Sequence, residues 1–251
     1  MIDRGLLLSL AAVALVVTAA VRWVPPVTLP RRDFWDVAFP PLVVGVVTAR
    51  LAAVALDDPG ALGTIKDLLI IRSGMHFWAG VAGAVLAAGW SLRHRGSRSL
   101  LFSRMADLAP YGLWGYATYE VTCLVRDGCF GPPAAVGLRP LGLLETQFPV
   151  GVTVALVVAG LGIAVMHVAS DHPRRSALLA VGGLALVRSV AAFWLPRLSA
   201  GPTRQQLESF AVALAVLLAG AGAWALNWYR SRPASSGPAI SGGLSGGEQA
   251  R

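Results

Sequence analysis

Ionisable side chains occur inside long apolar segments of the chain, where their types and spacing could support acid–base chemistry. Glu120 is the most informative, because it belongs to a polar series with the spacing i, i+4, i+7 and i+11, which falls on one face of a helix. The series consists of Tyr116, Glu120, Cys123 and Asp127. An ionisable group in lipid costs roughly 2.5 to 3.5 kcal/mol on insertion scales, so such residues usually face the bundle interior and mark a function. The alternative is a structural ion pair of Glu120 with Arg50 or Arg188.

A second polar group is predicted at one set of ends of the apolar segments. Guanidinium groups match phosphate oxygens bidentately, so several arginines at one membrane level suit a phospholipid headgroup. These arginines are Arg72, Arg126, Arg139 and Arg204. His76, close to Arg72, could act as a base, and Glu145 and Gln206 lie at the same level. The alternatives are arginines that only reach toward the interface and a structural histidine.

Seven apolar segments are long enough to position these residues across a membrane. The chain is 55% hydrophobic and 14% charged, with a mean hydropathy of +0.64, which is more apolar than a soluble domain. A hydrocarbon core of about 30 Å needs about 20 apolar residues. The segments are 6–21, 37–56, 75–90, 108–125, 148–169, 176–195 and 210–228. We therefore predict an all-α integral membrane protein with a bundle of about seven transmembrane helices.

The loop arginines predict the orientation of this bundle. Twelve basic residues fall on loops that would share one side and seven on the other, with Arg50 and Arg188 inside segments. The positive-inside rule then places the N-terminus outside and the C-terminus in the cytoplasm. Residues 1–229 form the predicted transmembrane domain, and residues 230–251, rich in Ser, Gly and Pro, a disordered cytoplasmic tail. A cleaved signal peptide is the alternative for the first segment.

Metal, cofactor and nucleic-acid functions have little support in the sequence. Cys123 and Cys129 are six residues apart, which fits no zinc motif, and we expect no metal and no cofactor. The basic residues form short groups beside the membrane without interleaved aromatics, so we expect no nucleic-acid partner. Lys66 is the only lysine and lies in a loop, which disfavours a retinal Schiff base.

Six short blocks of the sequence stand out: residues 46–51, 72–80, 107–110, 119–131, 139–145 and 205–209. They appear in the order found in the prolipoprotein diacylglyceryl transferase family, which the chain resembles over roughly residues 34–228. The block 72–80 resembles the family's Gly-Gly-Met-Ser-Phe-His-Gly-Gly segment, and 119–131 its Gly-Arg-x-Gly-Cys/Asn signature. The block 139–145 resembles His-Pro-Thr-Gln-Leu-Tyr-Glu, and 205–209 resembles Gly-Gln-x-x-Ser.

The chain also departs from this family pattern at functional positions. Glu120 stands where the family has its signature arginine, and Trp78 stands where it has a histidine, with His76 two positions earlier. In the sixth segment the family's Arg-Phe-x-x-Glu-x-x-Arg pattern is matched only at Arg188. Leu144 replaces the tyrosine before Glu145. The resemblance therefore supports the fold more strongly than the catalysis.

The resemblance implies transfer of a diacylglyceryl group from phosphatidylglycerol to the thiol of a lipobox cysteine in a preprotein, at the bacterial cytoplasmic (inner) membrane. The implied catalytic residues are His76, Glu120 and Glu145. The implied phospholipid-binding residues are Arg72, Arg126, Arg139, Arg188, Arg204 and Gln206. The alternatives are a non-catalytic member that binds phospholipid or lipoprotein precursor, and a transporter or receptor.

Overall fold

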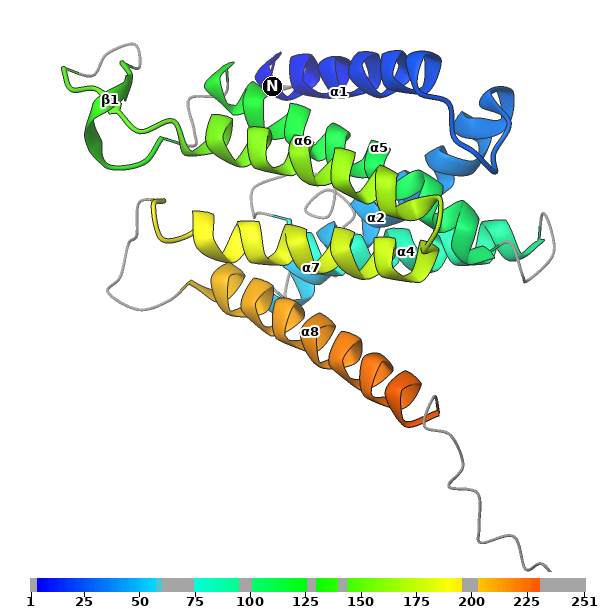
Figure 1. Ribbon diagram of the computed structural model, residues 1–251. Helices are drawn as coiled ribbons and strands as arrows, with labels where there is room; N and C mark the ends of the chain where they lie inside the picture. The colour runs from blue at the N-terminus through cyan, green and yellow to red at the C-terminus, as the bar shows by residue number, and fades with distance from the viewer. Residues whose placement is uncertain are drawn as a thin grey trace, which may run out of the picture.

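The computed structural model describes residues 4–57, 59, 75–94, 101–125, 130–139, 144–195 and 203–230 (Figure 1). Its described residues form seven α-helices, which correspond in order to the seven apolar segments. The helices are α1 (Arg4–Trp23), α2 (Phe34–Asp57), α4 (Phe77–His94), α5 (Leu101–Val121), α6 (Val150–Ala169), α7 (Pro173–Ala191) and α8 (Arg204–Arg230). Two short 3₁₀ helices, η1 (Arg31–Asp33) and η4 (Thr122–Val125), and one short strand, β1 (Pro133–Leu138), complete the described elements. The predicted all-helical class is confirmed.

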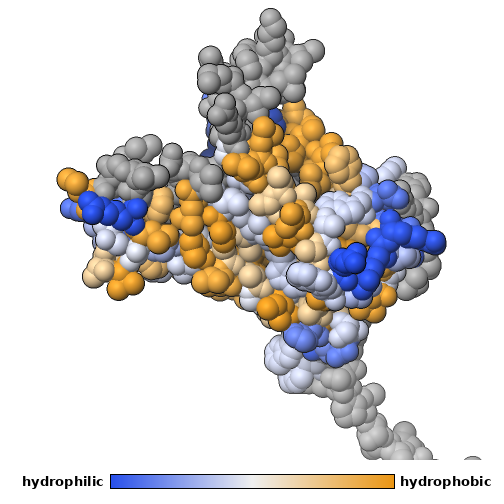
Figure 2. Space-filling model, turned by 90° about the horizontal axis from the view of Figure 1, so that it is seen from above, coloured by the Kyte–Doolittle hydropathy of each residue, from blue (hydrophilic) through white to orange (hydrophobic). Residues whose placement is uncertain are grey.

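Three of the described helical stretches are long and apolar enough to cross a membrane. They are Arg31–Asp57, Val150–Ala169 and Arg204–Leu226. Apolar side chains cover the middle of the face shown in Figure 2, and hydrophilic residues gather toward its two ends. On α8, Leu217 and Trp224 are each 70% exposed. Large exposed apolar side chains along a helix suit contact with lipid, because lipid tails are as apolar as these side chains and shield them from water.

Most packed helix pairs run antiparallel, while α5 and α7 run parallel, so the helix ends gather at two levels of the bundle (Figure 1). The helices α5, α6 and α7 pack in sequence, α1 packs on α5, α8 on α7, and α2 on α4 (Figure 1). One level, the site end, holds the C-terminal ends of α2, α5 and α7 with the N-terminal ends of α4, α6 and α8. The other level is called the opposite end. Residues far apart in the sequence therefore meet at the site end.

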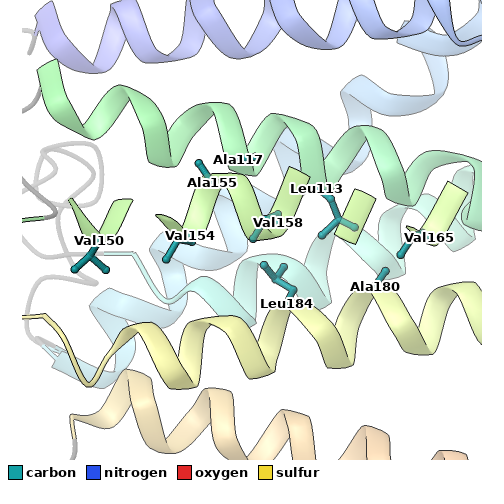
Figure 3. Close-up of a cluster of buried hydrophobic side chains, with 9 residues drawn as sticks. All are labelled: Leu113, Ala117, Val150, Val154, Ala155, Val158, Val165, Ala180 and Leu184. Atoms are coloured by element: carbon teal, nitrogen blue, oxygen red, sulfur yellow. The ribbon is translucent and has the colours of Figure 1, made fainter. Parts of the chain in front are cut away.

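A core of small and branched side chains joins α5, α6 and α7 (Figure 3). Val158 and Val165 of α6 are fully buried at its centre. The cluster comprises Leu113, Ala117, Val150, Val154, Ala155, Val158, Val165, Ala180 and Leu184. Its contacts hold the C-terminal turns of α5 and α7 at fixed positions, and these turns carry Glu120 and Arg188.

Helices α2 and α4 pack closely, because small residues face each other along their contact. A Cβ atom added at Gly80 would lie 3.0 Å from the Gly45 carbonyl oxygen. A Cβ atom at Gly83 would overlap the side chain of Thr48, whose hydroxyl donates hydrogen bonds to Val44 (2.8 Å) and to Ala79 across the interface (3.3 Å). Close approach of this kind is the usual packing of helices that lack a hydrophobic driving force between them.

The boundaries of α5 differ from the predicted segment 108–125. The helix begins at Leu101 and ends at Val121, and the chain continues as η4. The Thr122 hydroxyl donates to the Tyr119 carbonyl at 2.8 Å, a local bond that competes with the α-helical pattern. Of the predicted single face, Tyr116 and Glu120 lie on α5, whereas Cys123 lies in η4. Asp127 lies outside the described residues.

Candidate functional site

Three consecutive residues at the start of α4 contact three different partners at the site end. The His76 backbone N–H donates to the Ala49 carbonyl at 3.1 Å, which fixes the start of α4 against α2. The three side chains of His76, Phe77 and Trp78 then diverge, because successive positions on a helix point about 100° apart. Each side chain organises a separate group of residues.

The His76 side chain belongs to an ionic network with Asp57, Arg204 and Glu208, here called the His76 network. Its Nε2 lies 3.6 Å from Asp57 Oδ2, and its Nδ1 lies 3.4 Å from Glu208 Oε1. Arg204 contacts the same two carboxylates, at 3.3 Å from Asp57 Oδ1 and 3.2 Å from Glu208 Oε1. The network thereby joins α2, α4 and α8. Since the His76 side chain is only 14% exposed, the network reaches from solvent into the bundle.

The Phe77 ring packs under a second group, here called the Arg188 cluster, which comprises Phe77, Tyr116, Glu120 and Arg188. The Arg188 guanidinium carbon lies 3.9 Å from the Phe77 ring centroid, a cation–π contact. Arg188 also donates a hydrogen bond to the Tyr116 hydroxyl and lies 3.9 Å from Glu120 Oε1. The Arg188 and Glu120 side chains are 16% and 18% exposed. The structural alternative for Glu120, a pair with Arg188, is therefore present.

The Trp78 indole N–H donates to Ser209 Oγ at 2.9 Å, which joins α4 to the first turns of α8. Ser209 is 1% exposed, and Gln206, one turn earlier, is 7% exposed. Among the described residues, Gln206 Oε1 and Arg188 Nε are buried without a hydrogen-bond partner. Buried polar atoms of this kind are costly to leave unpaired, so the site end offers one acceptor and one donor to a polar ligand.

A family comparison gives this arrangement a chemical context. The family model described as prolipoprotein diacylglyceryl transferase matches residues 4–228. The chain belongs to the prolipoprotein diacylglyceryl transferase family. No curated protein matches the chain. Family membership and the apolar helices together support a membrane location and a diacylglyceryl transferase-like function. The substrates of this family are of two kinds, lipids and lipoprotein precursors.

The structure separates the residues that the sequence proposed for this transferase-like site. His76, Glu120, Arg188, Arg204 and Gln206 all lie at the site end. Arg139 and Glu145 are exposed, on either side of the undescribed stretch between β1 and α6. The remaining proposed arginines, Arg72 and Arg126, lie outside the described residues, so the predicted convergence of four arginines stays a prediction.

Asp57 and Glu208 are site residues that the sequence reasoning missed. Glu208 stands four residues after Arg204 on one helix, and this i, i+4 spacing could have indicated the pair. Asp57 carried no local signal, because its partner Arg204 is 147 residues away in the sequence. Phe77 was also missed, since an aromatic residue in an apolar segment is ordinarily read as packing.

The block 107–110, which helped to define the family resemblance, is structural in this fold. Asp107 accepts hydrogen bonds from the Thr28 backbone N–H, at 2.6 Å, and from the Thr28 hydroxyl. One turn later, the Tyr111 hydroxyl donates to the Val24 carbonyl at 2.5 Å. Both residues lie at the opposite end of the bundle, where they fix the connection between α1 and α2.

Cys123 forms a disulfide and is 1% exposed in η4, directly after the helix that carries Glu120. The only other cysteine of the chain, Cys129, lies outside the described residues. Disulfides persist mainly in oxidising compartments.

Proposed function

We propose that this protein transfers a diacylglyceryl group from phosphatidylglycerol to the thiol of a lipobox cysteine in exported preproteins. The observation that carries the proposal is at the start of α4. There, His76 is the candidate base, and the next residue, Phe77, holds the candidate phosphate-binding cation. His76 lies between two carboxylates, and Phe77 packs against the Arg188 guanidinium. Thioether formation from a phospholipid needs both groups within one site.

His76 supplies the base in this proposal. A free thiol has a pKa of about 8.5, so most of it is protonated at neutral pH and the nucleophilic thiolate has to be generated. An imidazole oriented by a carboxylate is a common arrangement for removing such a proton. Asp57 and Glu208 provide carboxylates on both sides of His76.

Arg188 supplies the cation that stabilises the departing glycerol phosphate. The leaving group gains negative charge as its bond to the diacylglyceryl carbon breaks, and a preorganised donor aimed at that charge is typically worth about 100- to 1,000-fold in rate. Glu120 Oε1, at 3.9 Å, already neutralises part of the Arg188 charge. The phosphate therefore has to displace or share this contact.

The second candidate is a family member that binds phospholipid or lipoprotein precursor without transfer. Two observations favour it: Glu120 reverses the charge of the family's signature arginine, and Trp78 occupies the family's histidine position and is hydrogen-bonded to Ser209. In this case the Arg188 cluster is a permanent ion pair that holds α5 and α7 together.

The test is incubation of the purified protein with phosphatidylglycerol and a lipobox peptide, with detection of the thioether product and of glycerol phosphate. We expect both products from the unaltered protein, a loss of about 100-fold or more in His76→Ala, and no loss in the control His172→Ala, an exposed histidine at the opposite end. Transfer that survives both His76→Ala and Glu120→Ala contradicts the residue roles. Binding of phosphatidylglycerol without products supports the second candidate.

We also propose that the site end faces the outside of the bacterial inner membrane, with the C-terminus in the cytoplasm. The loop-arginine bias and the Cys123 disulfide support this orientation. A reporter active only in the cytoplasm, fused after Arg230, is expected to be active. If the cytoplasmic reporter is inactive and a periplasmic reporter at the same position is active, the orientation is the opposite of the one proposed.

A further inference from the structure

The His76 network contains more groups than a base and one orienting partner require. On the basis of the proposed function, we infer that His76 Nε2 takes the thiol proton, Glu208 fixes the imidazole through Nδ1, and Arg204 retains Asp57 while the thiol occupies Nε2. Glu208 and Arg204 are then positioning residues. His76 is the only member of the network that reacts with the substrate.

The two nitrogens of one imidazole explain why a carboxylate has to move. A neutral histidine carries one N–H donor and one lone-pair acceptor. In the structure both nitrogens of His76 face carboxylate oxygens, at 3.4 Å and 3.6 Å. A nitrogen that accepts a thiol proton cannot face an anion at the same time. One of the two contacts therefore opens before reaction.

Glu208 is the carboxylate that stays. Its contact to His76 Nδ1 is the shorter, and its side chain is 28% exposed. Arg204 Nε, on the same helix, binds the same oxygen at 3.2 Å. The next residue, Ser209, is buried and bound to Trp78, so the backbone at Glu208 is anchored to α4. The Glu208 carboxylate is therefore held in a fixed position, where it can accept a hydrogen bond from His76 Nδ1–H.

Asp57 is the carboxylate that opens. It is the last residue of α2, its side chain is 46% exposed, and its contact to His76 Nε2 is the longer of the two. Its other oxygen, Oδ1, lies 3.3 Å from Arg204. When Oδ2 leaves His76, Asp57 keeps a cationic partner, so the displaced carboxylate is not left without a counter-charge.

The proposed reaction step needs no group other than the thiol, the phospholipid and the His76 network. The proton of the cysteine thiol moves to His76 Nε2, which leaves a thiolate and an imidazolium that donates to Glu208 from Nδ1. The thiolate sulfur attacks the diacylglyceryl carbon, so a C–S bond forms and the C–O bond to phosphate breaks. The electron pair of that bond leaves with glycerol phosphate. The proton on Nε2 then passes to the phosphate or to water.

The kinetic test compares alanine variants of the two carboxylates. Glu208→Ala is expected to lower kcat by roughly 10- to 100-fold with little change in KM for the lipobox peptide, because it disturbs the base without removing a peptide contact. Asp57→Ala is expected to lower kcat less than Glu208→Ala does, because the Asp57 contact to His76 opens before the reaction. The control Asp171→Ala, an exposed aspartate at the opposite end, is expected to leave kcat unchanged. A larger kcat loss in Asp57→Ala than in Glu208→Ala overturns the assignment.

A second measurement does not depend on transfer activity. In ¹⁵N histidine NMR spectra of the purified protein, the His76 signals are assigned by their absence in His76→Gln. Neutral His76 is expected to carry its proton on Nδ1, to shift toward the Nε2 tautomer in Glu208→Ala, and to remain unchanged in Asp57→Ala. A tautomer that follows Asp57 and ignores Glu208 overturns the inference. If the tautomer behaves as expected but no transfer occurs, only the proposed function fails.

Discussion

The two ends of the bundle use polar side chains in different ways. At the opposite end, Asp107 and Tyr111 bond to the Thr28 and Val24 backbone, so they satisfy main-chain groups of a connecting segment. At the site end, His76 and Arg188 contact mainly side chains that come from other helices. The first pattern builds a loop. The second assembles ionisable groups whose positions depend on how several helices pack.

Energetics reinforce this contrast. A backbone N–H bonded to a carboxylate is a charge-assisted bond, and its loss leaves a donor unpaired. A largely buried ion pair such as Arg188 with Glu120 adds little net stability, because desolvation of both charges offsets their attraction. Stability alone therefore explains Asp107 well and Arg188 poorly. This difference supports the proposed role of Arg188 in binding phosphate.

The largest expected effect tests this proposed role of Arg188. Arg188→Gln is expected to lower transfer by about 100- to 1,000-fold, because it removes the cation that we propose stabilises the leaving phosphate. It also removes the cationic partner of the largely buried Glu120 carboxylate, a loss that typically costs about 3 to 5 kcal/mol of stability in a buried pair. Transfer is measured as product formed per folded protein, and stability as thermal unfolding in detergent.

The double variant Arg188→Gln with Glu120→Gln separates these two effects. Both side chains are then neutral and can hydrogen-bond to each other, so stability is expected to return while transfer stays low. If transfer recovers together with stability, Arg188 acts only as a structural partner of Glu120, and the contrast between the two ends fails.

The corresponding change at the opposite end is Asp107→Ala. We expect unfolding to require about 1 to 3 kcal/mol less free energy, since the Thr28 N–H and hydroxyl lose their acceptor. Transfer per folded molecule is expected to be unchanged. Asp36→Ala, an exposed aspartate at the same end, is the matched control and is expected to stay within about 0.5 kcal/mol. A selective loss of transfer in Asp107→Ala would move this end into the functional site.

Sequence patterns predicted the helices and some of the site, for reasons visible in particular residues. Apolar length identified the seven α-helices of the described residues, because that signal is local. The position of Glu120 inside an apolar segment indicated a partner, and Arg188 is the observed one. The change from α5 to η4 was missed because the Thr122 side-chain bond beside it leaves the apolar pattern unaltered.

The His76 network was only half predictable. His76 and Arg204 were selected by residue type, but neither was assigned to the carboxylates that they share. Asp57 and Glu208 enter the network only because the C-terminal end of α2 and the N-terminal ends of α4 and α8 lie at one level. This level is set by packing between distant segments, and the close spacing of α2 and α4 is the part of that packing most open to test.

Gly83→Ala tests how far the site end depends on this spacing. The added methyl group overlaps the Thr48 side chain, and overpacking of this kind typically costs about 1 to 3 kcal/mol. Gly89→Ala on the same helix is the control, because no atom lies within 4 Å of its added Cβ, and it is expected to be neutral or to stabilise by about 0.4 to 1 kcal/mol. Equal unfolding temperatures for the two variants would contradict the observed packing.

The smallest expected effect concerns Trp78, which joins the two helices on either side of the His76 network. Trp78→Phe keeps an aromatic ring but removes the N–H that donates to Ser209, a loss of about 0.5 to 1.5 kcal/mol. Because Ser209 follows Glu208 on α8, a looser α8 weakens the hold on the His76 imidazole. We therefore expect transfer to fall by less than about tenfold, with a small decrease in unfolding temperature.

Trp90→Phe, which changes an exposed tryptophan near the other end of α4, is the control. A loss of transfer as large as that of His76→Ala would instead make Trp78 part of the reacting site, and the contrast between anchoring and reacting groups at this end would no longer hold.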